Sequence, residues 1–332
     1  MMKILTWFVP SRRMRHKMRA ALKNKNIGRK LDNIKNILSV RTDFSKIPQP
    51  HGYMELCQQA NLKMLFAFDK LCKQNGIDYF MNAGDVIGMI RHGRPIPWDY
   101  DSDCGVAGAD WKKTLSLLRR ILPNKHFGIV YVANFLKICY GGAGIDIFKY
   151  SHFSRDIDWT VDVKMIGARE KKFCNKLKRR PMIIIRADES VEEIDRKWNL
   201  IEKYDSELDR LFDKYVLLVE PQDDCGAVIY AGGSSEIFEY GTVFPTRRLN
   251  YGGTELSFPN NVGDYAMMLY GDIWQFPNDV LTHPGISASA IEYFKMKKAF
   301  ENISGVDLYE MLSVPRLLSK NMVQDKFRQE TF

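Results

Sequence analysis

The chain of 332 residues is 45% hydrophobic and 12% aromatic, which excludes a disordered protein and suits one elaborated domain or two closely packed ones. Its net charge is +9, yet ten of its 49 Lys and Arg residues lie within residues 1–30, which contain no Asp or Glu. The remainder therefore carries 39 basic against 40 acidic residues, and this balance argues against nucleic acid as a partner.

The first 30 residues are predicted to form a basic amphipathic arm. Residues 1–10 are largely apolar, but they are too few to span a bilayer and lack the small-residue cleavage site of a secretory signal. Met14, Met18 and Leu22 recur at four-residue spacing between basic residues, so a helix here has one apolar stripe with cationic flanks. Such a helix can lie on an anionic membrane, where each basic group contributes on the order of 1 kcal/mol. A solvated tail, or one docked on the body, is the alternative.

A helix and a strand precede the most informative part of the chain. Residues 56–74 place apolar side chains near helical spacing, and Gly76 ends the predicted helix. Residues 77–81 are typical of a strand, after which Gly84 turns the chain into a short helix that carries Arg91. This layout suits a phosphate, because glycine lets the backbone approach and the helix start offers unpaired N–H donors. An ordinary strand-to-helix turn is the alternative.

Residues 96–106 bring three carboxylates together. Asp99, Asp101 and Asp103 alternate with other residues between an apolar entry and an apolar exit, so in an extended strand they project from one face. Clustered carboxylates repel one another, and a cation is their natural partner. Hard oxygen ligands in small number, with room for water and phosphate oxygens, suit Mg²⁺ or Mn²⁺. The run therefore predicts a divalent metal site.

Other interpretations of this acidic run compete with a catalytic metal site. A calcium loop requires Gly at its sixth position and Glu at its twelfth, where this chain has Cys104 and Asp110. A solvated acidic turn, or the metal-binding Asp-x-Asp of nucleotide-sugar glycosyltransferases, is compatible with the acids taken alone. The flanking motifs decide between these interpretations.

The elements after the acidic run supply a fourth carboxylate. Residues 110–122 are predicted to be helical, and residues 127–140 show strand-like alternation. Residues 141–144 then turn the chain into a strand that bears Asp146. A hairpin that carries Asp146 beside the strand of Asp101 and Asp103 would bring three acids around one pair of cations.

The rest of the chain gives weaker signals. The six cysteines are scattered without a Cys-x-x-Cys pair, which predicts reduced thiols in a cytoplasmic protein and neither a disulfide framework nor a zinc cluster. The remaining predicted elements are strands at 159–166 and 182–186, a charged helix at 191–215, a hairpin turn at 251–254, a helix at 261–270, and mostly helix beyond 284.

The order of these motifs resembles that of the LicD/fukutin family, whose members resemble polymerase-β-type nucleotidyltransferases. The residues that carry the resemblance are Gly84 to Gly88, Arg91, the run from Ile96 to Asp103, Gly144 to Phe148, and the segments 243–249, 256–259 and 269–272. Together they cover roughly residues 52–285. Two positions depart from the family pattern, Asp85 where Ser or Thr is common and Tyr100 where another Asp is frequent. Neither departure removes an alternating carboxylate.

The resemblance implies an α+β fold. Its core is a polymerase-β-like nucleotidyltransferase fold, in which helices flank a mixed sheet, and a family-specific C-terminal α/β elaboration follows. We therefore expect a basic amphipathic arm and linker at residues 1–50, the catalytic domain at 51–285, and a C-terminal helical extension at 286–332.

The resemblance also implies a metal-dependent phosphotransferase. A CDP-activated alcohol is the donor, and phosphocholine, or glycerol or ribitol phosphate, passes to a hydroxyl of a cell-surface glycan while CMP leaves. With the basic arm, this places the protein on the inner face of the bacterial cytoplasmic membrane. There it acts on a lipid-linked or membrane-anchored glycan of lipopolysaccharide, capsule or teichoic acid.

Roles for individual residues follow from the resemblance and from the chemistry of the acids. The predicted ligands of Mg²⁺ or Mn²⁺ are Asp99, Asp101, Asp103 and Asp146. Asp101, Asp103 and Asp146 are also the predicted catalytic residues, and Asp146 either completes the metal site or accepts the proton of the acceptor hydroxyl. The predicted substrate contacts are Gly84, Asp85, Arg91, His92, Arg94, Arg247 and Arg248.

Three other functions stay open, and their products separate them. A nucleotide-sugar glycosyltransferase that uses the acidic run releases a nucleoside diphosphate. A nucleotidyltransferase that modifies a small molecule or RNA releases pyrophosphate from a triphosphate. A noncatalytic membrane scaffold tolerates the loss of all four acids.

Overall fold

A computed structural model describes residues 27–30, 33–34, 43–121, 127–132, 135–154, 168, 171–172, 175, 182–212, 225–230, 236–274 and 290–314. Contacts divide the chain into two compact units, one of residues 1–47 and 272–284 and the other of residues 48–271 and 285–332. In the first unit, the 3₁₀ helix η1 (Phe44–Lys46) places Phe44 6.3 Å from Trp274, measured between ring centroids. Most of the predicted arm and the strand predicted at 159–166 lie outside the described residues.

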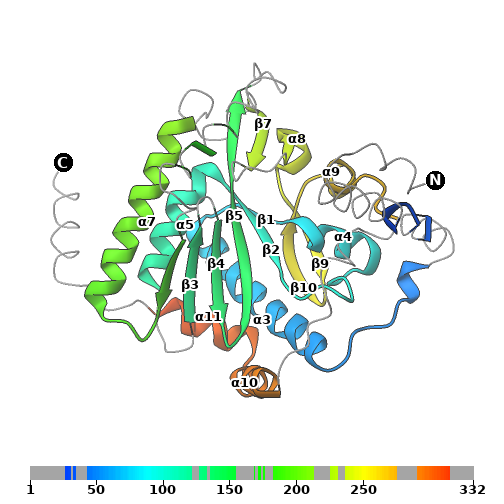
Figure 1. Ribbon diagram of the computed structural model, residues 1–332, viewed down its shortest axis with the longest axis horizontal. Helices are drawn as coiled ribbons and strands as arrows, with labels where there is room; N and C mark the ends of the chain where they lie inside the picture. Colours follow the sequence, from blue (N-terminus) through cyan, green and yellow to red (C-terminus); the bar gives the residue numbers. More distant parts are fainter. Residues whose placement is uncertain are drawn as a thin grey trace, which may run out of the picture. The chain divides into compact units, whose positions relative to one another are not determined.

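The second unit is built on a mixed sheet of eight strands (Figure 1). Six of them run in the order β1-β2-β5-β4-β3-β6, while β7 pairs with β5 and β8 with β7. Only the β2–β5 pair is parallel among the pairs in the described residues, and every other pair is antiparallel. The strands are β1 (Tyr79–Met81), β2 (Asp103–Ala107), β3 (Phe127–Val132), β4 (Phe135–Tyr140), β5 (Ala143–Ser154), β6 (Met182–Arg186), β7 (Cys225–Tyr230) and β8 (Ile237–Glu239).

Helices flank this sheet, which confirms the predicted α+β fold with a mixed sheet. They are α3 (Tyr53–Asn75), α4 (Ala83–His92), α5 (Gly108–Arg120), α7 (Val191–Phe212), α8 (Tyr240–Val243), α9 (Val262–Tyr270), α10 (Ala290–Phe300) and α11 (Gly305–Ser313). A separate hairpin, β9 (Arg247–Tyr251) with β10 (Thr254–Phe258), forms at the predicted turn. No helix in the described ranges is both long and apolar enough to cross a bilayer.

The two faces of the sheet differ in what they contact. One face packs on α3 and α7: the Phe68 ring lies 5.3 Å from the Tyr79 ring, and Lys149 forms an ion pair with Asp205. Figure 1 shows α3 and α11 behind the strands on this side. The opposite face carries Asp146, which alternates with the buried Ile147 along β5, and we call it the acidic face.

An aromatic cluster fixes β1 and β2 on the acidic face. The Phe80 ring makes edge contacts with Tyr150, Phe244 and Tyr265, at centroid distances of 5.1, 5.9 and 5.9 Å. A Cβ atom at Gly105 would lie 2.3 Å from the tip of that ring, so any larger residue there displaces Phe80. The glycine thus lets the ring lie against β2, two residues from Asp103.

The acidic run departs from its predicted form. Residues 97–102 are not a strand, because β2 begins only at Asp103. The backbone turns instead, with the Asp99 N–H donating to the Ile96 carbonyl at 2.9 Å. The prediction that three acids alternate along one strand is therefore wrong, and Asp99 and Asp101 lie in the preceding loop, which we call the acidic loop (residues 97–102).

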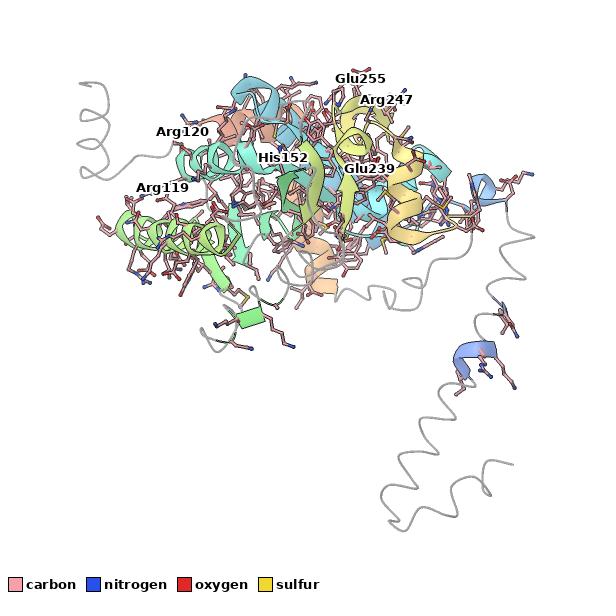
Figure 2. The ribbon with its side chains drawn as sticks, turned by 90° about the horizontal axis from the view of Figure 1, so that it is seen from above. Arg119, Arg120, His152, Glu239, Arg247 and Glu255 are labelled. Carbon is pink, nitrogen blue, oxygen red and sulfur yellow. The ribbon has the colours of Figure 1, made fainter. Side chains whose placement is uncertain are left out.

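His152 gives the fold an expected dependence on pH. Its side chain is 1% exposed, inside the ribbon in Figure 2, and packs on the rings of Tyr240 and Phe244. Neither ring nitrogen has a hydrogen-bond partner in the described part of the chain. Burial lowers the pKa of His152 to about 4, and the charge of Asp110 opposes this shift. The native protein therefore binds fewer protons than the unfolded chain between about pH 4 and 6.5.

Stability that depends on neutral His152 is present above the unfolded pKa near 6.5 and is lost as the pH falls toward 4. Between pH 7.5 and 5 its share of the free energy of unfolding falls by about 2 kcal/mol. We expect His152→Phe to reduce that loss in urea unfolding at the two pH values, whereas replacement of the exposed His51 by Gln leaves it unchanged. If His152→Phe lost as much unfolding free energy between pH 7.5 and 5 as the wild type, the expectation would be contradicted.

Candidate active site

The central pair of the site is Asp103 and Asp146. Asp103 is the first residue of β2, and Asp146 is the fourth of β5. The two are register partners on parallel strands, so their side chains project from the same face of strands that lie about 4.8 Å apart. The Asp146 N–H donates to the Ser102 carbonyl at 2.9 Å, which continues the pairing to the end of the acidic loop. Two carboxylates far apart in the sequence are thus neighbours.

Two polar residues of α3 hold the acidic loop. The Gln58 amide donates to the carbonyls of Ile96 and Asp99 at 2.8 and 2.7 Å. The Asn61 amide donates to the Tyr100 carbonyl at 2.8 Å, and its oxygen accepts from the Gly144 N–H at 3.3 Å. Sequence reasoning missed both residues. The sequence feature that could have indicated them is a pair of amide side chains three positions apart, on the face of α3 that also carries buried apolar residues.

The negative charges at the site repel one another. Burial raises the pKa of Asp103 well above its usual value, and so do the charges of Asp101, Asp85, Asp146 and Asp99, in that order. Each acid therefore makes ionisation of Asp103 less favourable. A positive charge placed among them would reverse this effect.

Lys137 supplies a positive charge next to this cluster. It is the register partner of Asp146 on β4, and its Nζ lies 2.8 Å from Asp146 Oδ1. Burial raises the pKa of Asp146, and the Lys137 ammonium opposes that rise. A lone lysine within an alternating strand gave no sequence signal, because its pairing depends on the hairpin register.

Asp85 lies beneath the site and is 4% exposed. Its Oδ2 accepts from the Asp103 N–H at 2.7 Å, and its Oδ1 accepts from the Tyr251 hydroxyl at 2.6 Å. Burial raises the pKa of Asp85 to about 7, although both hydrogen bonds favour the charged form. Because both oxygens are engaged inside the protein, the geometry does not agree with the predicted contact between Asp85 and a substrate phosphate. It indicates that Asp85 positions the start of β2.

The glycine turn leaves room for the side chain of Asp99. Asn82 caps α4, with its side-chain oxygen accepting from the Ala83 N–H at 2.7 Å, and its own N–H donates to the Asp103 carbonyl at 2.8 Å. A Cβ atom at Gly84 would lie 2.5 Å from Asp99 Oδ2. The missing side chain at Gly84 therefore makes room for a carboxylate of the acidic loop.

Gly84→Ala tests this close approach. The added methyl group occupies space within 2.5 Å of Asp99 Oδ2, so the carboxylate must move while the fold remains. We expect turnover to fall by roughly 10- to 100-fold with a change in unfolding free energy below about 1 kcal/mol, because displacement by about an ångström is costly for catalysis. Gly241→Ala is the matched control, since no atom lies within 4 Å of a Cβ there. Wild-type activity of Gly84→Ala would contradict a role for the Asp99 position.

The three basic residues predicted to face phosphate lie at the far end of α4. Arg91 and His92 belong to its last turn, and Arg94 follows its C-cap, so none lies at the helix start. Arg91 is buried, whereas His92 and Arg94 are half-buried. Burial lowers the pKa of His92 to about 4, and the charges of Arg91 and Arg94 lower it further, so its imidazole is neutral near pH 7.

The β9–β10 hairpin contacts α3 and Asp85, and so supports the elements that carry the site. Arg248 forms an ion pair with Asp69 of α3 at 2.5 Å and donates to the Ser257 hydroxyl at 2.9 Å. These contacts tie the hairpin to α3, and they do not agree with the predicted substrate contact of Arg248. The neighbouring Arg247 is exposed at the edge of the molecule (Figure 2). Tyr251, at the end of β9, is the hairpin residue that reaches Asp85.

The four predicted metal ligands fit a hard divalent cation by the chemistry of their donors. All are carboxylates, and the other three raise the pKa of Asp103. Oxygen donors of this kind suit Mg²⁺ or Mn²⁺. Within the described ranges, no group of three or more His, Cys, Asp and Glu side chains already has the geometry of a metal site. Their side chains must therefore close around an ion if they bind one.

Comparison with known proteins adds one match. Residues 76–185 match the family model described as LicD/FKTN/FKRP, nucleotidyltransferase domain. The matched segment contains β1, α4, the acidic loop and β2 to β5, so it includes every predicted metal ligand. A search of curated proteins found no match to the chain.

Proposed function

This chain is a LicD-family protein, and on that premise we propose that it is a phosphotransferase that moves a phospho-alcohol group to a hydroxyl of a glycan. The proposed donor is a CDP-activated alcohol, and CMP is the leaving group. Phosphocholine, glycerol phosphate or ribitol phosphate is the group transferred. The proposed acceptor is a cell-surface glycan of the lipopolysaccharide, capsule or teichoic-acid kind.

One observation carries the proposal: Asp103 and Asp146 are register partners on adjoining parallel strands. The acidic loop brings Asp99 and Asp101 near enough for their charges to raise the pKa of Asp103. Such a cluster suits the transfer of phosphorus-containing groups, in which a protein mainly positions the reactants and offsets developing charge.

The reaction moves one group and one proton. The oxygen of the acceptor hydroxyl forms a bond to the phosphorus that bears the alcohol, and the bond from that phosphorus to the CMP oxygen breaks. The carboxylate of Asp146 accepts the hydroxyl proton where it does not ligate the metal ion, and the proton passes to solvent where it does. Burial supports this role, because it raises the pKa of Asp146 and so makes the carboxylate a better base.

Asp99, Asp101, Asp103 and Asp146 would hold the metal ion. A bound Mg²⁺ or Mn²⁺ supplies Lewis-acid stabilisation of the phosphate oxygens. Lys137, which contacts Asp146, adds a second positive charge beside the transferred group. Arg91 and Arg94 remain proposed contacts of the donor phosphates, His92 a proposed uncharged contact there, and Arg247 a proposed contact of donor or acceptor.

Product analysis tests the reaction class. The purified protein is incubated with Mg²⁺ and CDP-choline, CDP-glycerol, CDP-ribitol or CDP-ethanolamine, together with a glycan acceptor, and the nucleotide products are separated. CMP release that depends on one CDP-alcohol supports the proposal. Release of a nucleoside diphosphate from a nucleotide sugar would instead identify a glycosyltransferase, and pyrophosphate from a triphosphate would identify a nucleotidyltransferase.

We also propose that residues 1–30 hold the protein on an anionic membrane at the cytoplasmic face. Most of this segment lies outside the described residues, so its composition alone supports the proposal: ten basic residues and no acid. Removal of residues 1–30 should release the protein from phosphatidylglycerol vesicles while CMP release on a short soluble acceptor persists. Retained vesicle binding would contradict this role.

A further inference from the structure

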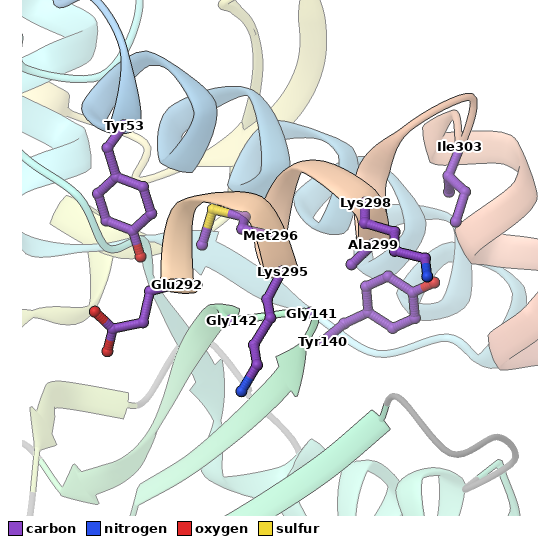
Figure 3. Close-up of a pocket in the computed structure, with 10 residues that line it drawn as sticks. All are labelled: Tyr53, Tyr140, Gly141, Gly142, Glu292, Lys295, Met296, Lys298, Ala299 and Ile303. Carbon is purple, nitrogen blue, oxygen red and sulfur yellow. The ribbon is translucent and has the colours of Figure 1, made fainter. Parts of the chain in front are cut away.

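A cavity of about 650 Å³ lies between the β4–β5 turn and α10, apart from the carboxylates of the site (Figure 3). Its size falls within the range of small-molecule sites, roughly 300 to 1,000 Å³. The residues that line it are Tyr53, Tyr140, Gly141, Gly142, Glu292, Lys295, Met296, Lys298, Ala299 and Ile303.

Close packing builds the walls of this cavity. The Tyr140 ring makes an edge contact with Phe300 at a centroid distance of 5.3 Å. A Cβ atom at Gly141 would lie 2.4 Å from the Cβ of Ala299, so the turn approaches α10 as closely as glycine allows. On the other side, Cys57 of α3 lies 3.8 Å from the Met296 sulfur. The cavity is therefore framed by three elements that contact one another.

The chemistry of the lining is mixed. Tyr53 of α3 provides an apolar face, whereas Tyr140 of β4 is 1% exposed and forms part of the wall. Figure 3 shows Lys298 running toward the tip of Tyr140 and Glu292 lying near the tip of Tyr53. Lys295 extends from α10 between them. Two lysine ammonium groups and one glutamate carboxylate beside an aromatic side chain suit a ligand that has a polar ring and an anionic group. They match a purely apolar ligand poorly, because the charges would lose hydration without gaining a partner.

The turn that lines the cavity leads into β5, which carries Asp146. Gly142 ends the turn that lines the cavity, and Asp146 stands four residues further, which is about 13 Å along a strand. The same helix, α3, contributes Tyr53 to the cavity and Gln58 and Asn61 to the acidic loop. Lys137 shares the face of Asp146 and Tyr140 points to the other face of the sheet, so an oligosaccharide in the cavity reaches Asp146 only by passing around the β4–β5 turn.

We propose that this cavity binds a phosphate-bearing sugar residue of the glycan acceptor. The Tyr53 ring contacts the sugar, Glu292 accepts from its hydroxyls, and Lys295 and Lys298 attract its phosphate. The assignment to an acceptor rests on the proposed function. Binding of a sugar phosphate does not depend on turnover.

Direct binding tests the cavity. Glucose 6-phosphate is titrated into the full-length protein in a ligand-observed NMR experiment, with glucose and inorganic phosphate as separate probes. We expect the sugar phosphate to bind more tightly than either probe, because both the Tyr53 ring and the lysines contribute. The double variant Lys295→Glu/Lys298→Glu should weaken it by about tenfold or more, since the charges that meet the phosphate are reversed.

Lys297→Glu is the matched control, because Lys297 is exposed on the same helix and does not line the cavity. It reverses one charge where the double variant reverses two, and it should alter the affinity by less than about twofold. Lys295→Gln/Lys298→Gln, which adds no negative charge, repeats the test if the reversed variant fails to fold. Equal weakening in the Lys297 variant, no binding to the wild type, or equally tight binding of inorganic phosphate would each overturn the proposal. Failure of the proposed function shows separately, as absent CMP release by the wild type while the sugar phosphate still binds.

Discussion

Asp103→Asn should abolish turnover and leave the protein folded, with thermal stability equal to or above that of the wild type. Replacement of the carboxylate removes one of four charges that would hold the metal ion, and loss of several kcal/mol of transition-state stabilisation lowers the rate by roughly 1,000-fold or more. The same change relieves repulsion, because burial and four neighbouring carboxylates raise the pKa of Asp103. Relief on the order of 1 kcal/mol corresponds to a rise of about 2–4 °C in the unfolding midpoint.

The measurement combines CMP release with thermal unfolding in metal-free buffer. Asp188→Asn serves as control, because Asp188 lies exposed in a turn after β6 and its replacement should alter neither quantity. An Asp103→Asn variant that retains wild-type turnover would remove this residue from the active site. A large loss of stability would show instead that its carboxylate supports the fold.

Asp85→Ala should reduce both stability and turnover while the donor KM changes little. The substitution leaves the Asp103 N–H and the Tyr251 hydroxyl without their acceptor in a buried place. Unsatisfied buried donors cost about 1–3 kcal/mol each, so we expect a loss on the order of 2 kcal/mol in unfolding free energy. Since Asp103 begins β2 directly above Asp85, loss of this support should lower kcat by roughly 100-fold.

Asp85→Asn separates positioning from substrate binding. Its remaining amide oxygen accepts one of the two hydrogen bonds, so stability and kcat should both lie between those of the wild type and Asp85→Ala. If Asp85 contacted a donor phosphate, as its place in the glycine turn suggested, the donor KM would change while stability stayed constant. That pattern in urea unfolding and steady-state kinetics would contradict the positioning role.

The end of the sheet that carries the acids could be anticipated from the sequence because the evidence for it is local. The alternation along residues 143–148 and the preceding glycines predicted a hairpin, and the hairpin places Asp146 beside Asp103. The predicted length of the acidic strand was wrong, because β2 begins only at Asp103. Contacts from α3 hold the acidic loop in a turn, and no pattern within the loop itself records them.

The residues that sequence reasoning missed or misassigned act through contacts far along the chain. Gln58 and Asn61 interrupt the apolar pattern of a helix, and the sequence gives no other indication of their role. Lys137 pairs with Asp146 through strand register. Arg248 fell within a family-like segment, yet its partner Asp69 lies 179 positions earlier. Motif order thus indicated a candidate site, and the tertiary contacts show which polar groups are engaged inside the protein around it.

Binding of a divalent cation, measured without substrate, tests the central claim most directly. Mn²⁺ is titrated into the wild type, Asp103→Asn, Asp146→Asn and Asp188→Asn, and the free ion is followed by electron paramagnetic resonance. We expect Asp103→Asn and Asp146→Asn each to weaken binding by about tenfold or more, and Asp188→Asn to match the wild type. Undiminished Mn²⁺ affinity in Asp146→Asn would show that the carboxylates of β2 and β5 do not form one metal site.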